Sequence, residues 1–384
     1  MQWAVLMKRN PLIDIKSLIS ITPAQIMSYL KAKGWVQEKV IHSVSSVWLQ
    51  KEFEIIVPLE TSYKDYNARV VDALETLAIF EGRSLDTVLK DIKNALKDVI
   101  RIRAISPATS KGTIPLEDGL HLLESTRELI SAAASSSVAP RANYPSRKSD
   151  KVIEFLKTIQ LGQTEEGSFV VTISTDIPPM LGLPSSPHEQ IPLEEPFERM
   201  VTLKLIESLD ACKEASKNSQ ASGDIKPFEL AIDKGVSANL CDAIAKINQS
   251  CGNEQVEISM AWALARPIQN NIPNTICFTQ DLIPYIAEAA RTFKETKPIE
   301  DFELKGIVIQ LKSKERKKEG EIVVIGLVDG QQRKVSIKLT KTEYDIAIKA
   351  HETITPIRCF GELKKLKKGF ALFKISHFSL TEFS

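Results

Sequence analysis

The sequence predicts a multi-domain α+β protein in which two α+β units precede a small five-stranded β-barrel. Three observations favour this class. The 384 residues exceed the usual size of a single core. The composition, 43% hydrophobic and 26% charged, is that of a globular chain rather than a disordered or membrane-embedded one. Segments of helical and strand period alternate from residue 22 to residue 298, and short strands dominate afterwards.

The first unit is expected to cover residues 22–134, after a loosely attached tail at residues 1–21. Thr22 followed by Pro23 is typical of a helix start. Residues 44–50 and 53–58 predict a hairpin that turns at Lys51 and Glu52. Apolar stripes then predict helices at 63–81, 85–96 and 115–134, with a strand at 99–105.

Residues 135–150 are predicted to be a linker, because the chain from 131 to 146 is rich in small residues and proline. The second α+β unit is expected at residues 151–298. Its predicted helices cover 152–159, 197–216, 228–248 and 281–295, and its predicted strands cover 169–174, 255–264 and 275–278.

The predicted barrel occupies residues 299–384 and has the order β-β-β-α-β-β. Val335, Ile337 and Leu339 alternate with Lys334, Ser336 and Lys338, which predicts a strand with one buried face. Thr340 and Glu343 form a capping box that opens the helix. Five strands with a helix between the third and fourth resemble an OB-fold. An SH3-like or split barrel with an inserted helix is the competing interpretation.

The OB-like order predicts a nucleic-acid-binding surface. OB-folds bind ligands on strands 2 and 3 and on the loops that join strands 1 to 2 and 4 to 5. Lysines and arginines at these positions would contact phosphates; they are Lys314, Arg316, Lys317, Lys318, Lys334, Lys338, Lys364, Lys365, Lys367 and Lys368. Alternatively, these loops are solvated turns. Single-strand binders also need exposed aromatic rings, and most of Phe360, Phe370, Phe373 and Phe378 are expected to fill the barrel core.

Charge is divided unevenly between the body and the barrel. The whole chain carries +1, but residues 299–384 hold 17 Lys+Arg against 12 Asp+Glu, a balance of +5, and the remainder carries −4. This excludes a protein that binds polyanions over its whole surface. It favours an accessory protein that contacts single- or double-stranded nucleic acid through its barrel. The alternative is a protein–protein adaptor subunit of a bacterial defence or DNA-maintenance assembly.

The sequence points to no catalytic residue, no metal and no cofactor. P-loop, GxGxxG, GxSxG and HExxH motifs are absent, and the five cysteines lack the spacing of a zinc site or a disulfide framework. With no apolar run of membrane length, a cytoplasmic protein without membrane contact is expected. An enzyme without a local motif is a third possibility, using a polar loop with Gln163, Thr164, Glu165 and Ser168; the alternative for this loop is a simple β-turn.

Overall fold

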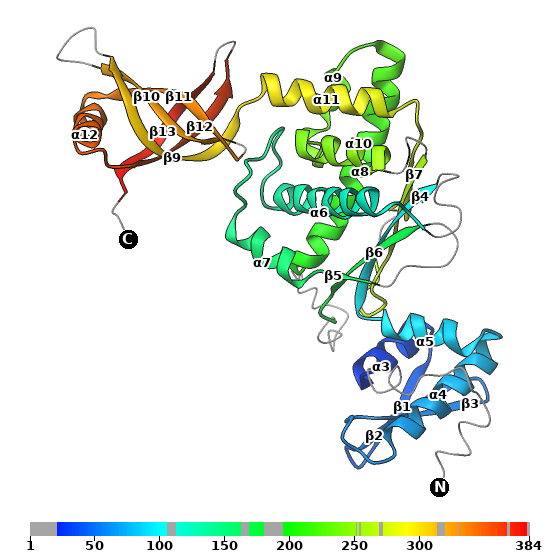
Figure 1. Ribbon diagram of the computed structural model, residues 1–384. Helices are drawn as coiled ribbons and strands as arrows, with labels where there is room; N and C mark the ends of the chain where they lie inside the picture. Colours follow the sequence, from blue (N-terminus) through cyan, green and yellow to red (C-terminus); the bar gives the residue numbers. More distant parts are fainter. Residues whose placement is uncertain are drawn as a thin grey trace, which may run out of the picture.

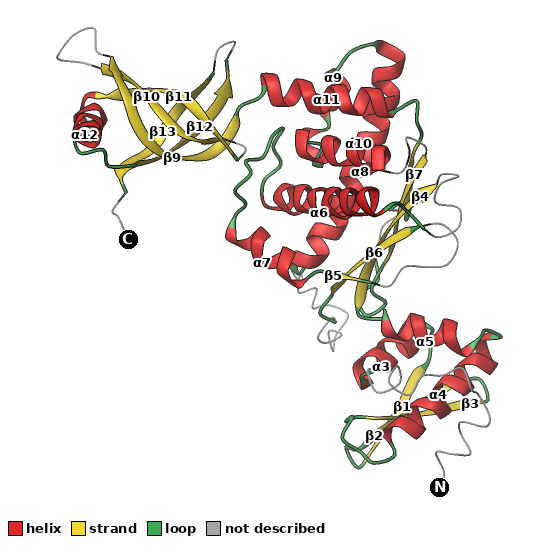
Figure 2. Cartoon of the chain, viewed as in Figure 1, coloured by secondary structure: helices red, strands yellow, loops and turns green. Residues whose placement is uncertain are grey.

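The computed structural model describes residues 21–105, 113–162, 169–179, 195–250, 252, 255–268, 272–312, 319–328, 330–366 and 369–381. The chain is a mixed α+β protein that ends in a closed five-stranded β-barrel. Figure 1 shows an N-terminal unit, a middle unit and the barrel in chain order, and Figure 2 shows the layering of helices and strands in each. No helix in this described part of the chain is both long and apolar enough to cross a lipid bilayer.

The N-terminal unit (residues 21–95) has a three-stranded antiparallel sheet and three helices. Its elements are α3 (Pro23–Ala32), β1 (Val36–Ile41), β2 (Ser45–Gln50), β3 (Phe53–Pro58), α4 (Tyr66–Glu81) and α5 (Leu85–Lys93). The predicted start at Thr22 is confirmed, since its hydroxyl accepts from the Gln25 N–H within a capping box. The hairpin of β2 and β3 is also confirmed. Strand β1 was not predicted, because its six side chains are all exposed and show no alternation.

The middle unit (residues 97–297) has a five-stranded antiparallel sheet whose order is β5-β6-β4-β7-β8. Its strands are β4 (Lys97–Ile105), β5 (Gln160–Leu161), β6 (Val170–Asp176), β7 (Gln255–Ala261) and β8 (Thr275–Phe278). Its helices are α6 (Leu116–Val138), α7 (Asp150–Thr158), α8 (Phe197–Ser222), α9 (Lys226–Leu230), a 3₁₀ turn η2 (Ile232–Lys234), α10 (Ala238–Ser250) and α11 (Ile283–Thr296). The long helices lie on one side of the sheet (Figure 1).

The hydrophobic cores divide the chain differently from the predicted boundaries. Strand β4 is the central strand of the middle sheet, and Ile102 on β4 packs in the same core as Leu129 on α6. The small-residue run that favoured a linker at 135–150 begins inside α6, where residues 131–136 are all buried. Small side chains here allow α6 to approach α8 and α10 closely. The chain between η2 and α10 is also close to α6, since a Cβ on Gly235 would lie 2.8 Å from the Ser136 hydroxyl.

The barrel (residues 299–381) closes in the order β10-β11-β13-β12-β9. Its elements are β9 (Ile299–Lys312), β10 (Glu319–Val328), β11 (Gln331–Thr340), α12 (Lys341–Glu352), β12 (Ile357–Lys365) and β13 (Phe370–Leu380). The predicted element order is confirmed, and so is the inward alternation of Val335, Ile337 and Leu339 on β11. Strands β11 and β13 run parallel, while the other neighbours are antiparallel. The capping box at Thr340 and Glu343 opens α12.

Strand β9 closes the barrel by pairing with β12 along its first half and with β10 along its second half. Gly306 lies at the crossover, opposite Ile357 on one side and Gly326 on the other. A Cβ at Gly306 would come within 2.1 Å of the Ile325 carbonyl oxygen, so only glycine permits this close approach. Gly306 therefore lies where one long strand passes from pairing with β12 to pairing with β10.

Candidate functional site

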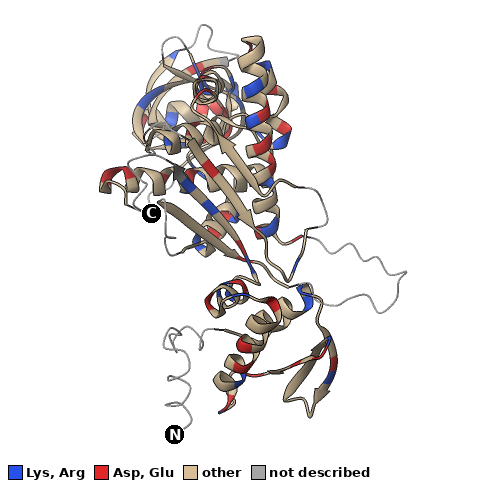
Figure 3. Cartoon of the chain, turned by 90° about the vertical axis from the view of Figure 1, so that its right-hand side faces the viewer, with Lys and Arg blue, Asp and Glu red and all other residues tan. Residues whose placement is uncertain are grey.

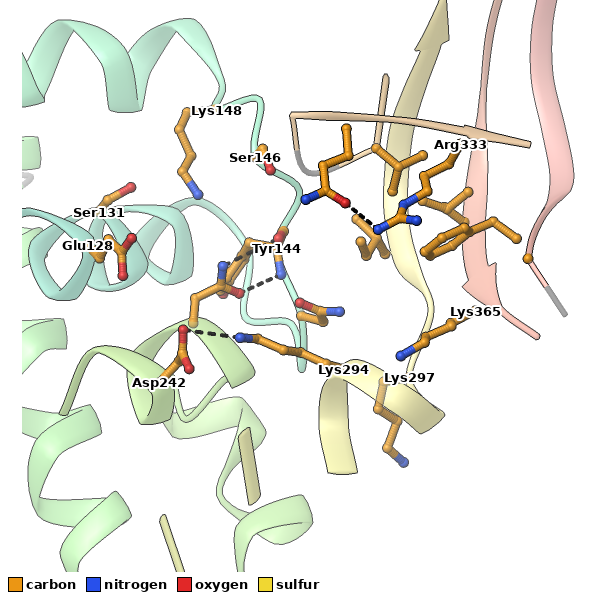
Figure 4. A pocket seen from close by; sticks show the side chains of 18 of the residues that line it. Glu128, Ser131, Tyr144, Ser146, Lys148, Asp242, Lys294, Lys297, Arg333 and Lys365 are labelled. Carbon is orange, nitrogen blue, oxygen red and sulfur yellow. Dashed lines mark hydrogen bonds and ion pairs between the residues drawn. The ribbon is translucent and has the colours of Figure 1, made fainter. Parts of the chain in front are cut away.

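A cleft of about 1210 Å³ lies between the middle unit and the barrel (Figure 4). One wall comes from α6, the connection between α6 and α7, α10 and α11. The other comes from the turn between β10 and β11, the start of β11, and the turn between β12 and β13. Among the described residues, eight basic side chains line the cleft, against the two acids Glu128 and Asp242; the basic ones are Arg127, Lys148, Lys246, Lys294, Lys297, Arg333, Lys334 and Lys365. Elements far apart in sequence thus form one basic concavity.

The connection between α6 and α7 is fixed against the start of α10. The Tyr144 N–H donates to Asn239 Oδ1 at 2.8 Å, and the Ala238 N–H donates to the Ala142 carbonyl at 2.7 Å. The Tyr144 hydroxyl donates to the Ala139 carbonyl at 3.0 Å and accepts from the Arg141 N–H at 3.0 Å. These bonds hold an otherwise irregular segment in place as one wall of the cleft.

Ion pairs join this connection to the start of β9. Arg141 contacts Asp301 at 2.6 Å and Glu300 at 3.2 Å, and Arg147 pairs with Glu303. The Glu303 side chain is only 7% exposed, so its carboxylate is poorly solvated and depends on its cations. These contacts position the barrel relative to the middle unit and so set the width of the cleft.

The cations of the cleft differ in whether a nearby carboxylate neutralises their charge. Lys246 lies 2.9 Å from Glu128 and 3.1 Å from Asp242, and Lys294 lies 3.1 Å from Asp242. Burial acts to raise the pKa of Asp242, but Lys294 and Lys246 outweigh it and lower that pKa, so this carboxylate stays ionised. Lys297 pairs with Glu229 at 2.9 Å, outside the cleft. Positive charge therefore remains in excess along both walls.

Five cleft cations make no ion pair with any carboxylate that the structure describes; they are Arg127, Lys148, Arg333, Lys334 and Lys365. Lys334 and Lys365 are exposed on the barrel wall, and Arg127 is exposed on α6. Arg333, beside Lys334, donates to the neutral Gln331 side chain. Uncompensated cations on two facing walls create a positive potential that attracts polyanions.

Lys148 is the most buried cation of the cleft. Burial lowers the pKa of its ammonium; Glu128 counteracts this shift, and Arg127 adds to it. Its Nζ donates to the Pro145 carbonyl at 3.1 Å, and in Figure 4 the side chain points from the connection toward α6. A poorly solvated ammonium with one neutral hydrogen-bond partner gains from the arrival of an anion.

The structure places only some of the predicted nucleic-acid contact residues in the cleft. Lys334 and Lys365 line the cleft. Lys338 and Lys364 are exposed but do not line it; Lys338 lies roughly 13 Å along β11 from Lys334, at about 3.3 Å per residue. Six predicted contacts lie outside the described residues, namely Lys314, Arg316, Lys317, Lys318, Lys367 and Lys368. The predicted ligand loop, Gln163, Thr164, Glu165 and Ser168, also lies outside them.

Sequence reasoning missed the cleft cations of the middle unit, Arg127, Lys148, Lys246, Lys294 and Lys297. Basic and acidic residues are interspersed along its helices (Figure 3), so no charge run marks the cleft wall. The expectation that most barrel phenylalanines fill the core is wrong. Of the four phenylalanines named for this expectation, Phe378 alone is buried, while Phe373 is 44% exposed and Phe360 and Phe370 are half-buried.

No cluster suited to a metal ion occurs in the ranges that the structure describes. Glu303, the carboxylate most deeply placed at the start of β9, is surrounded by cations instead. It lies 2.5 Å from Arg358 and 3.5 Å from Lys305, in addition to Arg147. These partners already balance its charge, so its role is to hold the barrel in place.

Comparisons with known proteins identify no relative: no protein-family model, no curated protein and no solved structure matches the chain. The charges and geometry of the cleft therefore provide the functional argument.

Proposed function

We propose that this protein binds nucleic acid, and that the cleft between the middle unit and the barrel contacts the phosphate backbone. The observation that carries the proposal is the excess of cations in one concavity, where the described lining has eight lysines and arginines against two acids. Phosphate contacts by such residues provide most of the sequence-independent affinity for nucleic acids. The role is that of a non-enzymatic accessory protein, because binding of this kind requires no reactive group.

We also infer that the barrel is OB-like. The helix between the third and fourth strands supports this assignment, and so does the closed order in which the fifth strand lies between the third and the fourth. OB-folds bind nucleic acids beside strands 2 and 3 and the loop between strands 4 and 5. In this barrel the start of β11 and the turn between β12 and β13 correspond to parts of that region, and both line the cleft.

A salt titration tests the proposed function. Fluorescence anisotropy with a labelled oligonucleotide should show binding at about 50 mM salt, with log affinity falling linearly as log salt rises. Each phosphate neutralised on a single strand contributes about −0.7 to the slope, so three to eight contacts give a slope of roughly −2 to −6. A peptide nucleic acid of the same sequence, whose backbone is uncharged, serves as the control and should not bind by this mechanism. A flat salt dependence, or no binding at low salt, would contradict the proposal.

A further inference from the structure

An aromatic ring lies on the barrel wall of the cleft, near two lysines that have no acidic partner among the described residues. Phe370 begins β13 and is half-buried. Its partner across the antiparallel pair is Lys365, and its partner across the parallel pair is Val335, which directly follows Lys334. The register therefore places Phe370 beside Lys365 and one residue from Lys334, at the end of the barrel where all three line the cleft.

The backbone just before Phe370 supports this arrangement. Gly369 has a φ of +87°, a conformation that glycine adopts without strain. A Cβ at Gly369 would lie 3.5 Å from the Lys334 carbonyl oxygen, so Gly369 lies close to β11. The Phe370 ring also packs partly against the barrel core. Its position is fixed by these contacts before any ligand arrives.

The opposite wall comes from α6 and from the connection that follows it. Figure 4 shows Ser131 and Lys148 on this side of the cleft and Arg333 and Lys365 on the other. Ser131 is only 4% exposed and its hydroxyl oxygen is buried, so it shapes this wall. Phosphates in the cleft would therefore have cations on both sides.

The concave shape favours a single strand over a duplex. Proteins read duplex DNA by inserting a helix or a β-ribbon into a groove about 12 Å wide, whereas these cations lie on the walls of a cleft. An aromatic side chain stacks on a base whose face is free, as in single strands. At about 1210 Å³ the cleft also exceeds the roughly 300–1,000 Å³ of a typical small-molecule pocket, which leaves room for a short segment of strand.

We propose that the cleft binds single-stranded nucleic acid, with one unpaired base stacked on Phe370 and the adjacent phosphates held by Lys334 and Lys365. This inference rests on the proposed function and names the class of its ligand.

The test compares Phe370→Leu with the native chain, using a single strand and a hairpin duplex of the same sequence. Leucine keeps an apolar side chain against the barrel core but removes the aromatic face. Affinity for the single strand should fall roughly 5- to 100-fold, the range expected for one stacked base. The salt slope should not change, because no phosphate contact is lost. Phe370→Tyr should restore affinity to within about twofold, since the ring is retained.

Two controls test whether the loss of affinity in Phe370→Leu comes from the contact between its ring and a base. Phe373→Leu changes an exposed phenylalanine on the same strand that does not line the cleft, and should leave affinity unchanged. A strand with abasic sites should bind the native chain more weakly than the normal strand, and Phe370→Leu should cause little further loss with it, because the two changes remove the same contact.

The outcomes separate this inference from the proposed function. If the native chain binds no oligonucleotide at low salt, both fail. If it binds but prefers the duplex, or if Phe370→Leu binds the single strand as the native chain does, the single-strand inference fails and the backbone-binding proposal stands. A strand that carries 2-aminopurine provides a direct signal, since its fluorescence should be quenched on binding to the native chain and not to Phe370→Leu.

Discussion

Reversing the charges of Lys334 and Lys365 together should lower the affinity for a single-stranded oligonucleotide by about 100-fold or more at low salt. Both lysines are exposed on the barrel wall, and neither has an acidic partner among the described residues. The variant Lys334→Glu/Lys365→Glu therefore breaks no ion pair in the described structure, but it places two carboxylates where phosphates should lie. The salt slope should become shallower by about 1.4, the contribution of two phosphates.

Two control variants make this prediction specific to the cleft. Lys349→Glu changes an exposed lysine on α12 of the same barrel, outside the cleft, and should have little effect beyond the change in net charge. Lys338→Glu/Lys364→Glu carries the same change in charge as the cleft variant but affects exposed lysines that do not line the cleft. If this second pair lowers affinity as much as the cleft pair, the contact surface is the outside of the barrel. Circular dichroism confirms that each variant is folded.

The substitution Asp98→Ala should have the largest effect on stability, a loss of about 3–5 kcal/mol in the free energy of unfolding. Asp98 on β4 is fully buried and joins three segments. Its carboxylate accepts from the Thr202 hydroxyl at 2.6 Å and from the Ala263 N–H at 2.8 Å, and it lies 3.2 Å from Arg199. Removal of this carboxylate leaves the buried Arg199 charge without its nearest counterion.

Arg199 has little capacity to compensate for that loss. Two of its guanidinium nitrogens, Nε and Nη1, already lack partners within the described structure, while Nη2 donates to the Arg266 carbonyl at 2.8 Å. Urea denaturation, followed by the fluorescence of Trp262, whose ring lies 5.3 Å from the Arg199 guanidinium, would measure the effect. The control is Asp176→Ala in the same sheet, where an exposed ion pair with Lys97 should contribute less than about 1 kcal/mol. Equal losses in the two variants would contradict the expected result.

The elements that were predicted correctly are those with local signals. From Lys334 to Thr340, strand β11 alternates between polar and apolar residues, and Thr340 with Glu343 specifies the start of α12 within four residues. The barrel order could therefore be read from the sequence, and the resemblance to an OB-fold predicted a barrel. No residue type encodes the parallel pairing of β11 with β13, which joins Val335 to Phe370, 35 residues later in the chain.

The boundary between the first two units was harder to predict for the same reason. Strand β4 follows α5 directly, yet its partners are β6 and β7, and β7 lies about 150 residues later in the chain. A strand pattern shows that a segment is extended, but not which sheet it joins. The serines and alanines of α6 show a related ambiguity, since the same composition suits a linker and a closely packed helix.

The cleft could be predicted only in part. The basic barrel suggested Lys334 and Lys365, because a fold hypothesis placed them near a binding surface. The opposing cations of α6, α10 and α11 lie on helices that carry both signs of charge, and only the packing of the middle unit against the barrel brings them to one surface. Phe370 was one of four candidate aromatic platforms of which most were expected in the core, and it is half-buried beside the cleft.

Photo-crosslinking tests the central claim most directly. A single-stranded oligonucleotide that carries 4-thiouridine would be bound to the native chain at low salt, irradiated and mapped by mass spectrometry. We expect crosslinked peptides from both walls of the cleft, residues 127–148 of the middle unit and residues 363–370 of the barrel. Crosslinks confined to the N-terminal unit, or to the surface around Lys338, would contradict the claim that the cleft binds nucleic acid.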